Sequence, residues 1–301
     1  MKRSRYKIVV IIICLILVGI MGRHFAKRIT TPIASIRVDE MTPLALELVY
    51  KGNKPQGISS VQSMAATDDY YIIAGRPFGT KKQGGETNNK LIIIDRKELH
   101  DVTKDFLSSG ATFELGHANG MTYDPINNEL IVVGIRNEQD ECDGVARIDV
   151  ESFAERGQWS LPCIGNGIAY NDVDDTFVVR DGKNLSVLDR DFSKVLFEYE
   201  VATDLTNQDI CYYDGYLYLV NWAYDSQAAR SVGIKTNQNV IYQVDMRNNC
   251  AVRAFVVCEP RLEMESMIFV DGEAYVLFNG GGSRYWYFYI YRVLFDENDL
   301  K

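Results

Sequence analysis

A short pattern recurs five times along this chain, and the recurrence limits the fold more than any other feature of the sequence. Each copy begins with a polar residue, continues with a small or acidic residue and then enters an apolar run. The copies begin at Gln56-Gly-Ile, Asn119-Gly-Met, Asn166-Gly-Ile, Gln208-Asp-Ile and Glu265-Ser-Met. They lie 63, 47, 42 and 57 residues apart, and such spacings are typical of folds built from repeated small units.

Each copy continues with further apolar strands between turns rich in Asp, Asn and Gly. The second strands are YYIIAG from Tyr70, ELIVVG from Glu129, TFVVR from Thr176, YLYLVNW from Tyr216 and EAYVLFN from Glu273. Third strands follow, and four of the five end in Asp, which initiates turns. Four copies have a fourth strand, at 112–115, 157–161, 195–201 and 251–257. This pattern predicts an all-β chain of four-stranded antiparallel sheets.

The segment LALELVY at 44–50 precedes the first copy, whereas the fifth copy has no fourth strand of its own. We expect Leu44 to Tyr50 to complete the last sheet beside Tyr287 to Val293, because closing a ring protects the sheet edges. The prediction is a five-bladed β-propeller over residues 44–301. A six-bladed ring is the alternative, with extra strands in the loops 76–90 or 221–239.

The first 28 residues differ from the rest. Residues 1–7 hold four bases, Ile8 to Met21 is almost entirely apolar, and Arg23, Lys27 and Arg28 follow. A helix of about 15 residues spans roughly 22 Å, and flanking basic side chains extend its reach toward the ~30 Å hydrocarbon core. We predict a cytoplasmic basic segment with a signal-anchor helix at 1–28 and a linker at 29–43. Whether the segment is cleaved stays open.

The charge distribution predicts the location and excludes one class of partner. The more basic side precedes the apolar run, which places residues 29–301 outside the cytoplasm on a single-pass protein of the cell membrane. Seven of the 32 Lys and Arg lie within residues 1–28, which leaves 25 bases against 41 acids in the remainder. A nucleic-acid partner is excluded because such binding needs clustered positive charge.

Two phrases resemble blades of known propellers. They are GHANGMTYDPINNELIVVG at 116–134 and GNGIAYNDVDDTFVVRDGKNLSVLDRD at 165–191. Both resemble blades of NHL- and lactonase-type propellers and of membrane-anchored bacterial surface propellers. The resemblance covers most of residues 44–295 and implies the propeller fold. It brings no catalytic signature, and propellers serve many unrelated functions.

The predicted topology gathers polar residues on one face. In each blade the innermost strand begins where the second strand ends, so these termini surround the central tunnel. We expect ligand binding there by Gln56, Arg76, Asn119, Arg136, Asn166, Arg180, Gln208, Trp222, Glu263 and Asn279. The alternative for each residue is a structural hydrogen bond to a neighbouring blade or to tunnel water.

Three residues at the unit starts are candidates for catalysis. His117 is a candidate general base, and Asp209 and Glu265 lie on adjacent blades as a candidate carboxylate pair. No cofactor is predicted, although a divalent cation near the tunnel is an alternative use of the two acids.

The chain has six cysteines, and five lie outside the apolar run. We predict one disulfide, between Cys142 and Cys163, because these residues fall at the same end of neighbouring strands. Cys211 is predicted to be a buried free thiol.

Two functions therefore remain after the sequence is considered. The first is a membrane-tethered module that binds a glycan, peptide or protein on its top face. The second is an extracytoplasmic hydrolase, lyase or lactonase that acts on a carbohydrate-like substrate.

Overall fold

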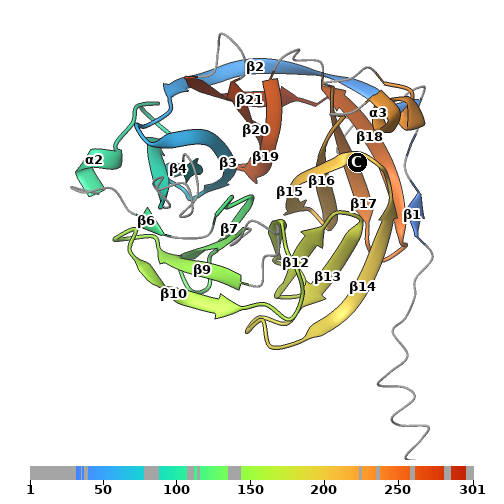
Figure 1. Cartoon of the computed structure of the whole chain (residues 1–301), viewed down its shortest axis with the longest axis horizontal. Coiled ribbons are helices and arrows are strands. Elements are labelled where there is room, and N and C mark those ends of the chain that lie inside the picture. Colours follow the sequence, from blue (N-terminus) through green and yellow to red (C-terminus); the bar gives the residue numbers. More distant parts are fainter. Residues whose placement is uncertain are drawn as a thin grey trace, which may run out of the picture.

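The computed structural model describes residues 32–34, 36, 40–77, 88–106, 112–113, 116–134, 144–223, 226–234, 238–257, 262–280 and 286–295. These residues form an all-β fold whose sheets are arranged around a common centre (Figure 1). The predicted all-β class is confirmed. The predicted anchor at residues 1–28 lies outside the described residues, and within them no helix is long and apolar enough to cross a membrane.

Each sheet is built mainly from strands that follow one another in the chain. The first contains β3 (Ile58–Ala66), β4 (Tyr70–Pro77), β5 (Asn89–Asp95) and β6 (Thr112–Phe113). The second contains β7 (Gly120–Asp124), β8 (Glu129–Val133), β9 (Gly144–Asp149) and β10 (Glu155–Ser160). The third contains β11 (Gly167–Asn171), β12 (Thr176–Asp181), β13 (Asn184–Leu188) and β14 (Val195–Ala202).

The last two groups are joined into one continuous sheet by the amino-terminal strand. The fourth group contains β15 (Thr206–Tyr213), β16 (Tyr216–Trp222), β17 (Asn239–Asp245) and β18 (Cys250–Val257). The fifth contains β19 (Leu262–Val270), β20 (Glu273–Gly280), β21 (Tyr287–Leu294) and β2 (Thr42–Asn53). The start of β2 pairs in parallel with the end of β18, with Thr42 opposite Phe255.

The predicted closing strand is confirmed. β2 pairs antiparallel with β21 from Ala45 opposite Leu294 to Asn53 opposite Tyr287, so a strand near the amino terminus and the last described strand share one sheet (Figure 1). This pairing uses the edge that the last sheet would otherwise expose.

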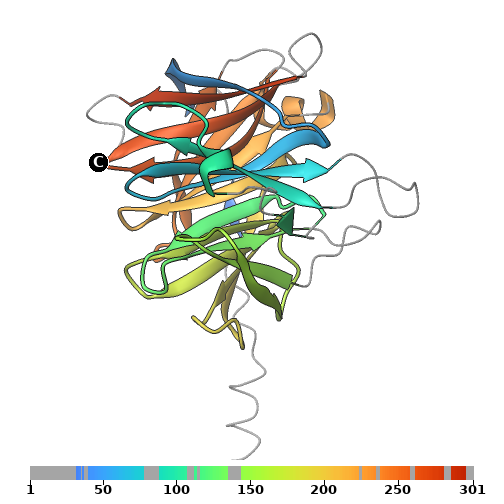
Figure 2. The same ribbon diagram turned by 90° about the vertical axis from the view of Figure 1, so that its left-hand side faces the viewer.

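Three further elements decorate the sheets. β1 (Ile33–Ala34) falls within the predicted linker and pairs in parallel with β14, with Ile33 opposite Val201 and fully buried. The short helix α2 (Thr103–Phe106) lies on the outside of the first sheet (Figure 2). The helix α3 (Ser226–Val232) lies between β16 and β17 in the chain, and its Ala229 and Val232 join the core.

Apolar side chains fill the spaces between adjacent sheets. Ile72 packs toward Leu130 and Val132 of the second sheet, whereas the next residue, Ile73, packs toward Leu277 of the fifth. Successive strand residues face opposite sides of a sheet, so a strand covered on both faces needs an unbroken apolar run. Burial of each such side chain stabilises the fold by roughly 1.5–3 kcal/mol. The second strands are almost continuously apolar for this reason.

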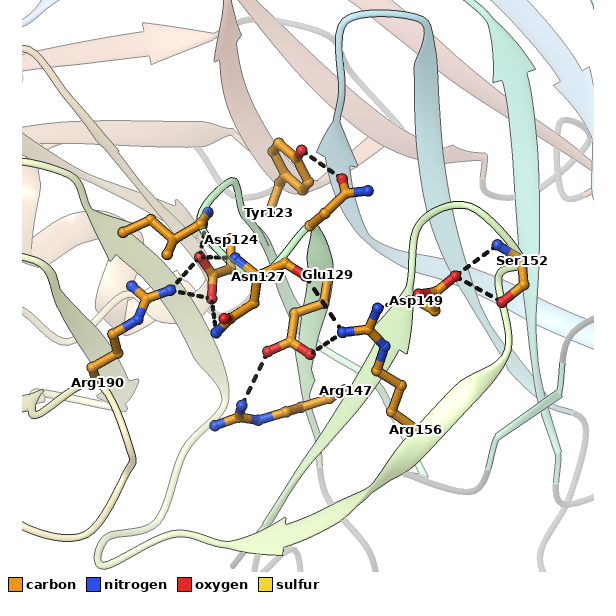
Figure 3. A network of polar contacts seen from close by, with 11 residues as sticks. Tyr123, Asp124, Asn127, Glu129, Arg147, Asp149, Ser152, Arg156 and Arg190 are labelled. Carbon is orange, nitrogen blue, oxygen red and sulfur yellow. Dashed lines mark hydrogen bonds and ion pairs between the residues drawn. The ribbon is translucent and has the colours of Figure 1, made fainter.

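Ion pairs and hydrogen bonds link adjacent sheets at the ends of the innermost strands. Asp124, at the end of β7, accepts two hydrogen bonds of 2.7 Å from Nη2 of Arg190, which follows β13 in the third sheet (Figure 3). Asp124 is 1% exposed and also accepts from the amide of Asn127. In the same view, Glu129 lies between Arg147 and Arg156 of its own sheet.

The Asp124–Arg190 pair gives a direct test of this link between sheets. We expect Arg190→Ala to lower the free energy of unfolding by about 2 kcal/mol, because it leaves a buried carboxylate without its cation. The control is Lys183→Ala, which removes the exposed partner of Asp204 and should change little. Urea titration measures both, and equal midpoints for the two variants would show that the Arg190 pair contributes nothing.

Candidate functional site

The innermost strands of all sheets meet at the centre of the molecule. They contact one another in the closed order β3, β7, β11, β15, β19 and back to β3. Glycines allow the closest approaches. A Cβ atom on Gly120 would lie 2.6 Å from Cα of Gly167, and one on Gly167 would lie 3.2 Å from Cα of Asp209.

Asp209 links these strands at the axis. Its fully buried carboxylate accepts hydrogen bonds from the backbone N–H groups of Met121, Ile168 and Ile210, on β7, β11 and β15. It also accepts from the hydroxyl of Ser266 on β19, at 2.7 Å, and Ser266 in turn accepts from the backbone N–H of Met64 on β3. One carboxylate and one hydroxyl thus connect all five innermost strands. Burial raises the pKa of Asp209 well above its usual range, and the four hydrogen bonds oppose that rise.

In each innermost strand, a polar residue directly precedes the residue that lies at the axis. These five residues, which we call the axial ring, are Gln62, Asn119, Asn166, Gln208 and Glu265. Four carry neutral amides and one carries a carboxyl group, so the ring offers hydrogen bonds with a single acidic group. Gln62, Gln208 and Glu265 are buried, and the two asparagines are half-buried.

A second polar group surrounds Glu265. This Glu263 cluster consists of Lys54, Arg76, Gln208, Glu263, Glu265 and Asn279. Its residues come from the connector after β2, the end of β4, the start of β15, the start of β19 and the end of β20. The predicted convergence of innermost-strand starts with second-strand ends therefore holds here.

Asn279 hydrogen-bonds both the buried acid Glu265 and the buried base Lys54. Its Oδ1 accepts a hydrogen bond of 2.8 Å from Nζ of Lys54, and its side chain also hydrogen-bonds Glu265. Lys54 Nζ donates a second bond to the carbonyl of Ser59 at 3.0 Å. Burial lowers the pKa of Lys54 to about 8, although the nearby charge of Glu265 favours the protonated amine.

The two acids of the cluster hold protons more tightly than ordinary glutamates. Burial and then the charge of Glu263 raise the pKa of Glu265 well above its usual range, against the opposing effects of Lys54, Arg76 and Asn279. Burial raises the pKa of Glu263 to about 7, although it accepts a hydrogen bond of 2.6 Å from Nε2 of Gln208. Of these two acids, Glu263 is therefore the one for which burial places the pKa near neutral pH.

Some polar atoms beside the axial ring are buried without a hydrogen-bond partner in the described part of the chain. They are Oδ1 of Asn119, Oδ1 of Asn166 and Nδ2 of Asn207. Buried polar groups are ordinarily satisfied by protein, water or ligand. These three atoms are therefore exceptions to that rule within the described residues.

Two predicted ligand-binding residues lie outside both the axial ring and the Glu263 cluster. Gln56 is exposed in the turn before β3, where its carbonyl accepts from Nζ of Lys90, and Gln62 takes the place in the axial ring. The predicted position, Gln56, lies six residues too early because β3 contains bulges and runs further before it reaches the axis. Arg180 is fully buried and donates to the carbonyls of Gly182 and Val220 and to Asn221, so it links the third and fourth sheets instead of meeting solvent.

The remaining predicted residues have varied surroundings. Trp222 is half-buried at the end of β16, and Arg136 lies outside the described residues. The candidate catalytic residues are divided between two environments: Asp209 is engaged by the strands, whereas Glu265 belongs to the Glu263 cluster. His117 is half-buried before β7 and is not among the groups that act most strongly on Glu265. Lys54 escaped prediction because it lies in a connector without a repeat motif.

The cysteine predictions are tested only in part. Cys142 lies outside the described residues, so the disulfide with Cys163 remains a prediction. Cys211 is a free thiol, as predicted, but it is half-buried instead of fully buried, and its burial raises its pKa to about 12. It is therefore a weak nucleophile at neutral pH.

Comparison with known proteins supports the fold. No protein-family model matches the chain, and no curated protein matches it. The glutaminyl cyclase of Myxococcus xanthus superimposes with a TM-score of 0.53 at 12% identity, covering 84% of this chain and 98% of that one. The GH43_1 enzyme of Xanthomonas citri, complexed with xylotriose, gives 0.56 at 10% identity and covers 83% and 92%. Both neighbours are β-propeller-like, so the predicted propeller architecture is supported, whereas a relation to NHL or lactonase proteins is not.

Proposed function

We propose that this chain is a five-bladed β-propeller, tethered to a membrane by residues 1–28, that binds a glycan, peptide or protein outside the cytoplasm. Five groups of four strands and the closed order of the innermost strands support the blade number. The apolar run from Ile8 to Met21, with basic residues on both sides, supports the tether.

The observation that carries the binding function is the axial ring beside the Glu263 cluster. The five innermost strands contact one another in a closed order, each with a polar residue next to the axis, and buried atoms of Asn119 and Asn166 lack partners within the described residues. In binding sites a few convergent polar groups on a rigid scaffold fix the orientation of the ligand. Ring closure fixes their positions before any ligand arrives.

One observation also favours an enzyme. A carboxyl group whose pKa lies near the working pH is suited to general acid–base catalysis, and the pKa of Glu263 is about 7. Glu265 lies so close to Glu263 that the charge of Glu263 raises the pKa of Glu265. The second candidate function is therefore a hydrolase, lyase or lactonase that acts on a carbohydrate-like molecule, with Glu263 and Glu265 as its acids.

The binding function is tested with full-length protein in detergent micelles on glycan and peptide arrays. Glu263→Gln preserves the size of the side chain and its acceptor for Gln208, and we expect it to weaken binding of the retained ligand at least about tenfold, a loss of roughly 1.4 kcal/mol. Glu151→Gln, the same change at an exposed turn, is the control. Mass spectrometry of the bound ligand then reports turnover. Unchanged binding by Glu263→Gln would show that the axial ring and the Glu263 cluster are not the binding site.

A further inference from the structure

The outer edge of the third sheet carries an apolar surface close to the place where the amino-terminal segment joins the fold. Resting on the tether proposed above, we propose that this surface lies against the lipid bilayer that residues 1–28 enter. This rim surface consists of Leu196 and Phe197 on β14 and Trp159 on β10. Both strands are the outermost of their sheets, so the contact leaves the axial ring uncovered by the membrane.

The three side chains of the rim surface are large, apolar and exposed. Leu196 is 38% exposed, Phe197 49% and Trp159 39%. Successive residues of a strand point to opposite faces, so Leu196 and Phe197 make both faces of β14 apolar at this point. Among the described outer strands β2, β10, β14 and β18, only β14 exposes two consecutive large apolar side chains. Such a strand at a sheet edge is ordinarily covered, because it otherwise promotes aggregation.

Trp159 is linked to the start of β14 by an arginine that lies between two aromatic rings. The guanidinium of Arg147 lies 4.7 Å from the ring centre of Trp159 and 5.2 Å from that of Phe192. Phe192 is buried in the turn directly before β14, and β10 and β14 follow the same side of the ring in Figure 1. Tryptophan is enriched at membrane–water interfaces, where its ring is apolar and its N–H group meets water.

The tether joins the third sheet beside the rim surface. Ile33 is fully buried and pairs in parallel with Val201 of β14. Because the pairing is parallel, the chain reaches Ile33 from the side of Phe197, which precedes Val201 by about 13 Å of strand. Arg28, the last residue of the predicted anchor, lies five positions before Ile33, and such a stretch spans at most about 18 Å. The end of the anchor is therefore within reach of the rim surface.

The attachment at Ile33 holds the rim surface near the bilayer in every copy of the chain. Ile33 and Val201 belong to one core cluster that also contains Leu185 and Ile210. The attachment therefore moves away from β14 only if the third sheet opens. A protein partner would have to enter the gap of at most about 18 Å between Ile33 and the anchor, whereas lipid is already there.

The contact does not depend on anionic lipids. Residues 29–301 carry 41 acids against 25 bases, so a negatively charged surface would repel the chain as a whole. The rim surface instead contributes apolar area, which binds the region between headgroups and acyl chains whatever the headgroup charge. Zwitterionic phosphatidylcholine is therefore a sufficient partner for the test.

The test places the full chain, one copy each, in phosphatidylcholine nanodiscs with plain or brominated acyl chains, because bromine quenches tryptophan on contact. The chain has three tryptophans. Replacing Trp222 and Trp286 with phenylalanine leaves Trp159 as the reporter. Replacing Trp159 and Trp222 leaves Trp286, which is exposed beside β21, across the ring from β10 (Figure 1). We expect brominated lipid to lower the emission of Trp159 by at least about one third and to leave that of Trp286 unchanged.

A second substitution changes the rim surface and keeps the reporter. Phe197→Ser should reduce the quenching of Trp159 at least about twofold, because it removes an apolar side chain that enters the interface. Leu48→Ser is the matched control, since Leu48 is exposed on β2 across the ring, and it should leave the quenching unchanged. Circular dichroism shows whether both variants are folded, and the comparison of Trp159 with Trp286 needs neither of them.

Two results would overturn the rim contact and leave the tether in place. One is quenching of Trp159 no stronger than that of Trp286 in a chain that enters the nanodiscs. The other is equal quenching of Trp159 with and without Phe197→Ser in a folded variant. A chain that does not enter the nanodiscs would overturn the tether and the rim contact together. The array experiment with Glu263→Gln is a separate measurement, so failure of the rim contact leaves the binding function standing.

Discussion

Replacing Asp209 with alanine is expected to lower the free energy of unfolding by about 3–5 kcal/mol, the largest effect of any single substitution proposed for this chain. The carboxylate accepts from the backbone N–H groups of Ile168 and Ile210 and from the hydroxyl of Ser266, all in the fully buried axis. Each buried donor that loses its acceptor costs about 1–3 kcal/mol. The melting temperature should fall by roughly 10 °C, which thermal unfolding monitored by circular dichroism measures.

The control for this substitution is Asp191→Ala, which removes an exposed carboxylate from the turn before β14. We expect its melting temperature to stay close to that of the unmodified chain. Asp209→Asn is a second informative variant, because it keeps an acceptor oxygen and should lose less stability than Asp209→Ala. If Asp209→Ala and Asp191→Ala have the same melting temperature, the axial hydrogen bonds do not hold the sheets together.

Alanine at position 120 is expected to cost about 3 kcal/mol for a different reason, which is overpacking. The added Cβ atom would lie 2.6 Å from Cα of Gly167 and 2.6 Å from the backbone nitrogen of Ile168. No side-chain rotation relieves a contact with backbone, so β7 and β11 must separate. Chemical denaturation should report a lower midpoint for Gly120→Ala, and intrinsic fluorescence or near-ultraviolet dichroism should report the altered packing.

Gly182→Ala separates steric contact from backbone strain. Gly182 has a φ of +55° in the turn between β12 and β13, and a Cβ atom there would meet nothing within 4 Å. Its replacement should cost only about 1 kcal/mol through the strained backbone. If Gly120→Ala is no more destabilising than Gly182→Ala, the innermost strands do not approach as closely as described.

The strands and the closing of the ring follow from the sequence because both depend on local patterns. The run at Tyr70 is apolar on successive residues since both faces of β4 are covered, and the unpartnered strand at 44–50 matches the missing fourth strand of the last repeat. Asp-Gly at 214–215 and 271–272 marks two of the hairpin turns, where Asp214 and Asp271 adopt positive φ.

The site is less predictable because it depends on where each side chain points. Gln62-Ser63-Met64 repeats the pattern of Glu265-Ser266-Met267, and this likeness identifies the first member of the axial ring. Gln56 starts a similar triplet six residues earlier, so the pattern alone does not distinguish them. Arg76 and Arg180 occupy similar strand ends, yet one is exposed and the other is fully buried against the next sheet.

A double-mutant cycle between Asp209 and Ser266 tests the convergence of the innermost strands most directly. The two residues lie 57 positions apart in sequence and on different strands, and their side chains are 2.7 Å apart at the axis. Residues in contact couple by about 0.5–3 kcal/mol, whereas distant residues add within roughly 0.5 kcal/mol. We predict a coupling above about 1 kcal/mol between Asp209→Ala and Ser266→Ala. Simple additivity of the two losses in unfolding free energy would contradict it.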